Sequence, residues 1–158
     1  MLVEFDEISD NSRIWIYASE RKLIIEEQNN ILEYISSHLQ NWKSHTVSLK
    51  SAVTILEHFF IIIALDESYQ LASGCSIDKL YKVIENLEED FSISLLNRLN
   101  VFCNIDKRIV CVPISQLSDN VSSDTLFYDL TISNKSDLSL FLKPIKSGWC
   151  NKFIKTID

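Results

Sequence analysis

Short runs of β-forming residues alternate along the chain with two segments that show helical spacing. Residues 13–18 (RIWIYA) are rich in β-branched and aromatic side chains, which predicts a first strand. Between residues 24 and 42 apolar positions return every three or four residues, as on an amphipathic helix. Residues 22–24 offer no side-chain acceptor for a helix cap, so the start of this helix is poorly defined by the sequence.

A hairpin of two strands is predicted next. Residues 47–55 alternate between apolar and polar side chains, as a half-buried or edge strand does. After a turn at residues 57–58, residues 59–65 (FFIIIAL) are apolar on both faces, which predicts a central strand. One face of that strand would be bare in a minimal two-layer fold, so we expect the C-terminal tail or a second subunit to cover it.

The clearest helical pattern lies at residues 77–91, where apolar side chains share one face. Ser76 is the predicted N-cap, with Asp78 in the first turn. Two further strands are predicted at residues 99–103 and 108–112.

The order strand, helix, strand, strand, helix, strand predicts an α+β protein with the ferredoxin-like β-α-β-β-α-β arrangement, a two-layer sandwich, here with an extra strand and a C-terminal extension. In that arrangement the first and third strands are central, and these are the two most apolar strands here. We expect a single domain over residues 1–158, with a core at about 13–113 and an extension at about 114–158. Within the extension, residues 126–128 suggest a short strand and residues 136–138 the start of a short helix.

Composition narrows the classes of function. The chain has 22 acidic and 15 basic residues and a net charge of −7, the wrong sign for a non-specific nucleic-acid binder. Its two glycines, Gly74 and Gly148, are too few for a P-loop or a dinucleotide fingerprint. The acidic N-terminus lacks the apolar segment of a signal peptide, and residues 59–65 are too short to span a bilayer. We therefore expect a cytoplasmic protein.

The four cysteines form no C-x-x-C pair, which excludes zinc-ribbon and thioredoxin motifs. In a reducing cytoplasm they are expected to be free thiols, although Cys103 and Cys111 could face each other across a hairpin. Metal binding by His45 with nearby carboxylates has no support from ligand spacing, so we predict neither a metal nor a cofactor.

The predicted topology brings distant residues to one pole of the domain. The end of the first helix and the end of the third strand meet there, together with the start of the second helix. Trp42 and His45 are therefore expected to lie near Asp66, Glu67 and the segment 73–78.

This pole offers two kinds of chemistry. A helix N-terminus presents unpaired N–H groups that suit an anion, and Gly74 permits close backbone approach or a positive φ. Cys75, just before the predicted cap, is placed where a thiol's pKa tends to fall, with His45 as base and Asp66 or Glu67 to orient it. The predicted ligand-binding residues are Trp42, Ser73, Gly74, Ser76 and Asp78.

A purely structural role would also account for these residues. Ser76 and Asp78 would only cap a helix, and Cys75 would be a small buried residue. Trp42 would belong to the core because it continues the apolar stripe of the first helix. His45 would end a loop, and Asp66 and Glu67 would mark the end of a strand.

Several short segments also suggest a family. They are WIY at 15–17, RKL at 21–23, Trp42 with His45, the pair Asp66 and Glu67, and SGCSID at 73–78. Over residues 13–150 the chain resembles a family of small uncharacterised bacterial proteins labelled "ABC transporter ATPase". The chain departs from that family at Ile24, where the family has a threonine-type cap, and at residues 148–150 (GWC), where it has Ser-Trp-His.

The family label implies ATP hydrolysis, which the residues do not support. Leu65-Asp66-Glu67 looks like the end of a Walker B strand, but no glycine-rich loop with its lysine accompanies it. The leading hypothesis is a binding or regulatory module whose pole holds a small anionic ligand or a protein partner. A thiol-dependent enzyme with Cys75 as nucleophile and a structural homodimer are the alternatives, and the sequence does not decide whether the protein is an enzyme.

Overall fold

The computed structural model describes residues 1–155 and contains helices and antiparallel sheets, which confirms the α+β class. The chain divides into two compact units. Unit 1 contains residues 1–96 and 133–136, and unit 2 contains residues 97–132 and those from 137 onward. The boundary between them falls inside the predicted core of 13–113.

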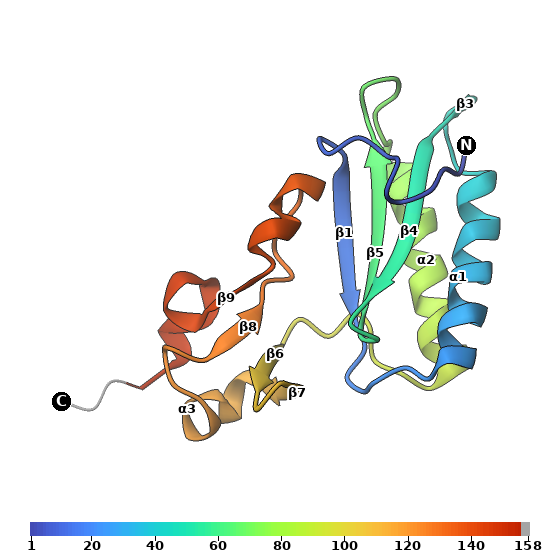
Figure 1. Cartoon of the computed structure of the whole chain (residues 1–158). Coiled ribbons are helices and arrows are strands. Elements are labelled where there is room, and N and C mark those ends of the chain that lie inside the picture. The colour runs from blue at the N-terminus through green and yellow to red at the C-terminus, as the bar shows by residue number, and fades with distance from the viewer. Residues whose placement is uncertain (156–158) are drawn as a thin grey trace. The chain divides into compact units, whose positions relative to one another are not determined.

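Unit 1 is built on a three-stranded antiparallel sheet with the order β1-β5-β4 (Figure 1). The strands are β1 (Arg13–Ala18), β4 (Lys50–Leu56) and β5 (Phe60–Asp66). β5 lies in the centre as predicted, and each of its residues is buried. A separate two-stranded ladder joins β2 (Lys43–Ser44) to β3 (Val47–Ser48).

The turn between β4 and β5 falls at the predicted position. Glu57 and His58 both have positive φ, at 54° and 61°, the mirror-image turn that matches the twist of the two strands. The register that follows places Thr54 and Ile16 on either side of Ile62.

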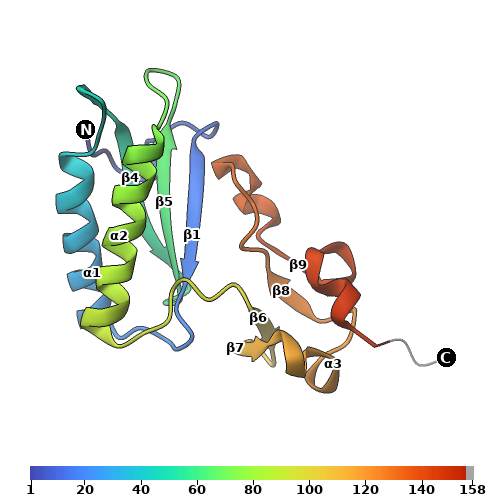
Figure 2. The same ribbon diagram turned by 180° about the vertical axis from the view of Figure 1, so that it is seen from behind.

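Two helices, α1 (Ile25–Gln40) and α2 (Gly74–Phe91), lie side by side on one face of this sheet (Figure 2). Their apolar positions, spaced by three and four residues, form the core of unit 1 with alternate residues of β5. Burying each of these aliphatic side chains stabilises the fold by about 1.5–3 kcal/mol. The fully buried members include Ile31, Ile35, Leu39, Leu80, Ile84, Leu87, Ile61, Ile63 and Leu65.

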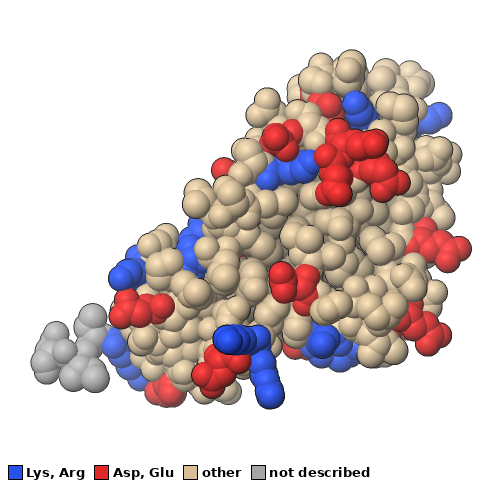
Figure 3. Space-filling model, in the orientation of Figure 1, with Lys and Arg blue, Asp and Glu red and all other residues tan. Residues whose placement is uncertain are grey.

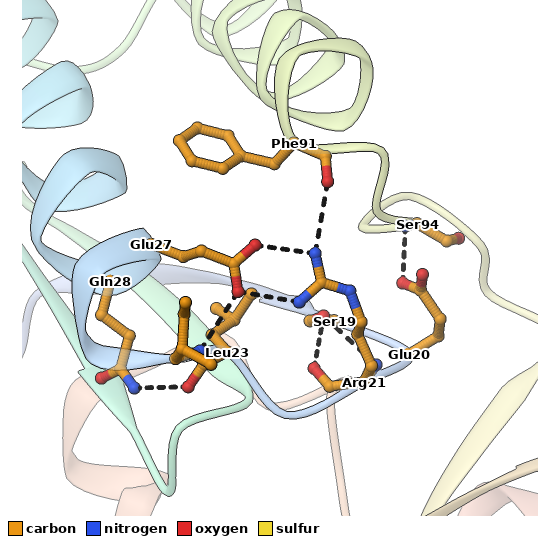
Figure 4. Close-up of polar contacts among 9 residues, drawn as sticks. Ser19, Glu20, Arg21, Leu23, Glu27, Gln28, Phe91 and Ser94 are labelled. Atoms are coloured by element: carbon orange, nitrogen blue, oxygen red, sulfur yellow. Dashed lines mark hydrogen bonds and ion pairs between the residues drawn. The ribbon is translucent and has the colours of Figure 1, made fainter.

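Polar side chains form a hydrogen-bonded network at the end of unit 1 where α1 begins and α2 ends (Figure 4). Ile24, the N-cap of α1, has no side-chain acceptor, and the Glu27 carboxylate instead accepts its N–H at 3.1 Å. The Arg21 guanidinium donates to both Glu27 oxygens at 2.8 and 2.7 Å and to the Phe91 carbonyl at 3.3 Å. The hydrogen bond from Arg21 is the largest cause that lowers the pKa of Glu27 to about 2, and the bond from the Ile24 N–H adds to it.

Unit 2 contains a four-stranded antiparallel sheet with the order β7-β6-β8-β9. Its strands are β6 (Asn100–Ile105), β7 (Arg108–Pro113), β8 (Leu126–Tyr128) and β9 (Leu142–Pro144). The predicted strands at 99–103, 108–112 and 126–128 are thus confirmed.

Short helices complete the chain. One α-helical turn, α3, covers Leu117–Asn120, and 3-10 helices cover Ile114–Gln116, Lys135–Leu140, Ile145–Ser147 and Trp149–Phe153. The 3-10 helix at Lys135–Leu140 matches the short helix predicted at 136–138.

The fourth predicted strand does not pair with β1, as it would in a ferredoxin-like sheet. That strand is β6, and it lies in the sheet of unit 2 because β7 and β8 occupy both of its edges. The outer edge of β1 is used by residues 133–134 instead: Ile14 N–H donates to the Ser133 carbonyl at 3.0 Å, and Arg13 bridges to Asn134. β1 is therefore not flanked on both sides by full strands.

Phe60, Ile62 and Ala64, on one face of β5, are buried. Over residues 1–155, no helix combines the length and the apolar character needed to cross a bilayer.

Candidate functional site

Four of the residues predicted for the pole line one pocket of unit 1. This pocket, of about 250 Å³, lies where α1 ends and α2 begins, next to the β2–β3 turn. Trp42, His45, Ser73 and Cys75 are among its lining residues, as the topological argument predicted. The remaining lining residues are His38, Asn41, Lys43 and Lys79.

The N-terminus of α2 starts three residues earlier than predicted, with Ser73 rather than Ser76 as the N-cap. Ser73 Oγ accepts the Ser76 N–H at 3.1 Å, and Ser76 Oγ accepts the Ser73 N–H at 2.7 Å. This reciprocal pair is a capping box with serine in place of the usual glutamate. Asp78 consequently lies beyond the first turn of α2, and that first turn contains no acidic residue. The serines three residues apart are the sequence signal for this start.

Capping leaves two donors at the helix end. Ser76 is buried and its N–H is taken by Ser73. The backbone N–H groups of Gly74 and Cys75, in exposed residues of the first turn, have no hydrogen-bond partner among residues 1–155. The positive end of the helix dipole adds to their attraction for an anion.

The charge of the pocket is opposite to that of the whole protein. Lys43, Lys79, His38 and His45 line it, and no Asp or Glu is among its lining residues. Burial, and secondly the Lys79 ammonium, lower the pKa of His38, which therefore favours the neutral imidazole. His38 Nε2 is buried and has no hydrogen-bond partner in the described part of the chain. The lining of the pocket thus contains four basic residues and no acidic one.

Trp42 forms the buried wall of this pocket. Its side chain is 2% exposed, its ring packs edge-to-face on Trp15 at 6.0 Å, and its Nε1–H donates to the Ser76 carbonyl at 2.9 Å. Trp42 therefore belongs to the core, and it also ties the end of α1 to the start of α2.

Cys75 is exposed, which corrects the alternative that it is a small buried residue. His45, in the turn between β2 and β3 with φ of 58°, is exposed as well. Within the described residues no hydrogen bond joins the Cys75 thiol to the His45 imidazole, although both line the same pocket.

Asp66 and Glu67 do not line the pocket, and both carboxylates have partners elsewhere. Asp66 accepts from the Ser68 hydroxyl at 2.6 Å and from its N–H at 3.0 Å, and these bonds lower the pKa of Asp66. Glu67 accepts the Ala72 N–H at 3.0 Å and lies 3.8 Å from the Arg13 guanidinium. Neither carboxylate is placed to orient His45.

Gly74 does not use the freedom expected of it. Its φ is not positive, and a Cβ at this position would meet no atom within 4 Å. The close approach expected of Gly74 is found at Gly148, where a Cβ would lie 2.2 Å from Cζ of Phe127.

The cysteines of unit 2 do not form the cross-hairpin pair considered from the sequence. The register pairs Cys103 with Val110 and Cys111 with Phe102, so the two thiols project from opposite faces of the hairpin. All four cysteines are free. No group of three or more His, Cys, Asp or Glu side chains in residues 1–155 is arranged to hold a metal ion.

Comparison with family models, with curated proteins and with solved structures finds no match for this chain. The assignment of the pocket therefore depends on its geometry and charge.

Proposed function

We propose that this protein is a binding module and that the pocket at the N-terminus of α2 holds a small anionic ligand. The observation that carries the proposal is the concentration of Lys43, Lys79, His38 and His45 around a pocket without carboxylates, in a chain of net charge −7. Figure 3 shows acidic and basic side chains interspersed on the face in view, without a broad basic area. A local anion site suits this distribution better than a nucleic-acid surface.

The size of the pocket favours a compact ligand. Sites for drug-sized molecules usually have volumes of about 300–1,000 Å³, whereas this pocket has about 250 Å³. A phosphate or a small carboxylate fits such a space, and the N–H groups of Gly74 and Cys75 supply directed donors for its oxygens.

The proposal is tested by titrating the protein with inorganic phosphate while recording its backbone amide spectrum. We expect the largest shifts at the Gly74 and Cys75 amides, and about tenfold weaker binding for Lys79→Gln, since a charge-assisted hydrogen bond contributes about 1.5–3 kcal/mol. Lys82→Gln, an exposed lysine on α2 outside this pocket, is the matched control. Phosphate shifts absent from residues 73–75, or equal affinity for both variants, would contradict the proposal.

His38 is also expected to strengthen binding as the pH falls. The pKa of His38 is lowered in the free protein, and a bound anion would raise it by favouring the protonated imidazole. By linkage, a group whose pKa rises on binding takes up a proton, so the contribution of His38 to phosphate affinity increases as the pH falls toward the pKa of His38. A His38→Gln variant should lose this part of the pH dependence.

A thiol-dependent enzyme is the second candidate, and the exposure of Cys75 in the same pocket as His45 favours it. The pH dependence of alkylation at each cysteine, resolved by mass spectrometry, tests it. Fast reaction of Cys75 below pH 7, slowed in His45→Ala, would support an activated thiolate. An ordinary thiol profile in both proteins would reject catalysis at Cys75.

Four further hypotheses from the sequence stay proposals. They are a protein partner at the same pocket, a cytoplasmic location, kinship with the family labelled "ABC transporter ATPase", and a homodimer through the sheet face. The order of β1, α1, β4, β5 and α2 supports describing unit 1 as a ferredoxin-like arrangement that lacks its last strand.

A further inference from the structure

A second pocket, of about 410 Å³, lies within unit 2 and differs in chemistry from the first. Aromatic and aliphatic side chains dominate its lining, with Phe127, Tyr128, Trp149 and Leu130 among them. Arg98 is the one charged residue among the lining residues. Its volume lies within the range of small-molecule sites, which are mostly apolar with a few polar groups that fix orientation.

The strand register explains why the sheet opens at this place. β8 pairs with β6 only at Cys103 and Asn104, and it ends at Tyr128. The next residue, Asp129, bonds instead to the segment before β9: its N–H donates to the Phe141 carbonyl at 2.8 Å. Asn100, the first residue of β6, is therefore left without a β8 partner on that edge.

Asn100 presents backbone hydrogen-bonding groups at this opening. Ile114 N–H donates to the Leu99 carbonyl at 2.8 Å, so the carbonyl of Leu99 faces the β7 side, while the Leu99 N–H donates to Asn97 Oδ1 at 2.9 Å. Because backbone groups alternate along a strand, the N–H and carbonyl of Asn100 face the edge away from β7. No residue in the described part of the chain pairs with them there. A backbone donor and acceptor thus border a pocket whose lining is mostly apolar.

The rings of the pocket are held firmly. Phe127 is fully buried, and Gly148 brings its backbone so close that a Cβ would lie 2.2 Å from the ring. Trp149, the next residue, packs edge-to-face on Phe153 at 6.2 Å between ring centres. A pocket with fixed aromatic walls needs little ordering when a flat ligand enters.

We propose that this pocket binds a small aromatic acid. The aromatic side chains would contact the ring of the ligand, the Asn100 backbone would bond a polar atom, and Arg98 would face the anionic group. A guanidinium carries five N–H donors, so Arg98 can serve a carboxylate while it keeps its interactions within the chain. The proposal is independent of the phosphate pocket of unit 1.

The experiment titrates the full chain with indole-3-acetate, with indole as the uncharged analogue and acetate as the analogue without a ring. We expect indole-3-acetate to shift the resonances of the Asn100 amide and the Trp149 indole N–H. It should bind at least tenfold more tightly than either analogue, and added phosphate should not change its affinity. Arg98→Gln should reduce the affinity for indole-3-acetate about tenfold and leave indole unchanged.

Leu130→Trp should fill the pocket and remove binding of indole-3-acetate, whereas Leu140→Trp, at an exposed position outside the pocket, should retain it. Thermal melting of both variants shows whether they fold. Absence of shifts at residues 98–101 and 127–131 at millimolar probe would overturn the site. Equal affinity for indole and indole-3-acetate would overturn the acidic ligand.

Discussion

The two glycines of this chain have opposite surroundings. Gly148 lies against the buried ring of Phe127, where a Cβ would come within 2.2 Å of a ring carbon. Gly74 is the first residue of α2 and has open space around it. Only one of them is therefore required by packing, although the sequence singled out the other.

A pair of alanine substitutions should separate the two roles. Gly148→Ala is expected to lower the free energy of unfolding by about 1–3 kcal/mol, because the added methyl displaces a ring in a packed core. Gly74→Ala should raise it by less than about 1 kcal/mol, since alanine reduces the entropy of the unfolded chain without a clash. Urea unfolding of the three proteins measures both. A neutral Gly148→Ala would show that Phe127 moves at no cost.

At the scale of elements, α1 and α2 begin in different ways. α2 has a serine capping box, whereas α1 depends on Glu27, which reaches back to the Ile24 N–H and is held by Arg21. The first arrangement is uncharged, and the second depends on a carboxylate whose pKa is lowered to about 2. Only the start of α1 should therefore respond directly to acid.

The acid response has a defined sign. A carboxyl with a lowered pKa in the folded state adds stability that is complete above its unfolded pKa, near 4.5, and is lost as the pH falls toward about 2. Glu27→Gln should cost at most about 1 kcal/mol at pH 7, because the pair borders solvent, and should flatten the decline in stability between pH 5 and pH 2. Urea unfolding at several pH values measures this. Glu26→Gln, on an exposed neighbour in the same turn, is the control, and an equal effect there would refute the role of Glu27.

Elements whose signal is local were predicted well. β1 has the predicted bounds, and the turn at residues 57–58 is where polar residues interrupt two apolar runs. The start of α2 was placed three residues late because Ser73 and Ser76 can each cap a helix, and only the folded geometry selects between them. The ferredoxin-like arrangement would place β6 beside β1, but β6 pairs with β7 and β8 instead. Strand edges compete for partners, and the local sequence pattern does not show which of two distant edges is preferred.

At the scale of the molecule, topology predicted part of the candidate site. Trp42, His45, Ser73 and Cys75 meet because the end of α1 and the start of α2 share one pole. The basic residues His38, Lys43 and Lys79 were missed, since an isolated lysine or histidine on a helix or turn looks like ordinary surface. The pocket of unit 2 was missed because it arises where β8 leaves β6, which no sequence window shows.

The two units can be followed separately. The helices α1 and α2 and the exposed Cys75 belong to unit 1, whereas the buried Cys103 and Cys150 belong to unit 2. Burial is the main cause that raises the pKa of Cys103 to about 12 and that of Cys150 to about 11, and both side chains lie in the core of unit 2. In the folded protein at pH 8 we expect Cys75 to be alkylated and these two to be protected.

With increasing urea, Cys103 and Cys150 should become reactive together because they share one core. They should do so before the helical circular dichroism of α1 and α2 is lost. The strands β8 and β9 have three residues each, whereas α1 and α2 have 16 and 18, so unit 2 is the region expected to open at lower free energy. Pulsed alkylation with mass spectrometry at each urea concentration follows both thiols. If Cys103 reacts in the folded protein at the rate of Cys75, the core of unit 2 is open. If Cys103 and Cys150 stay protected after the helices are lost, unit 2 is the more stable part of the chain.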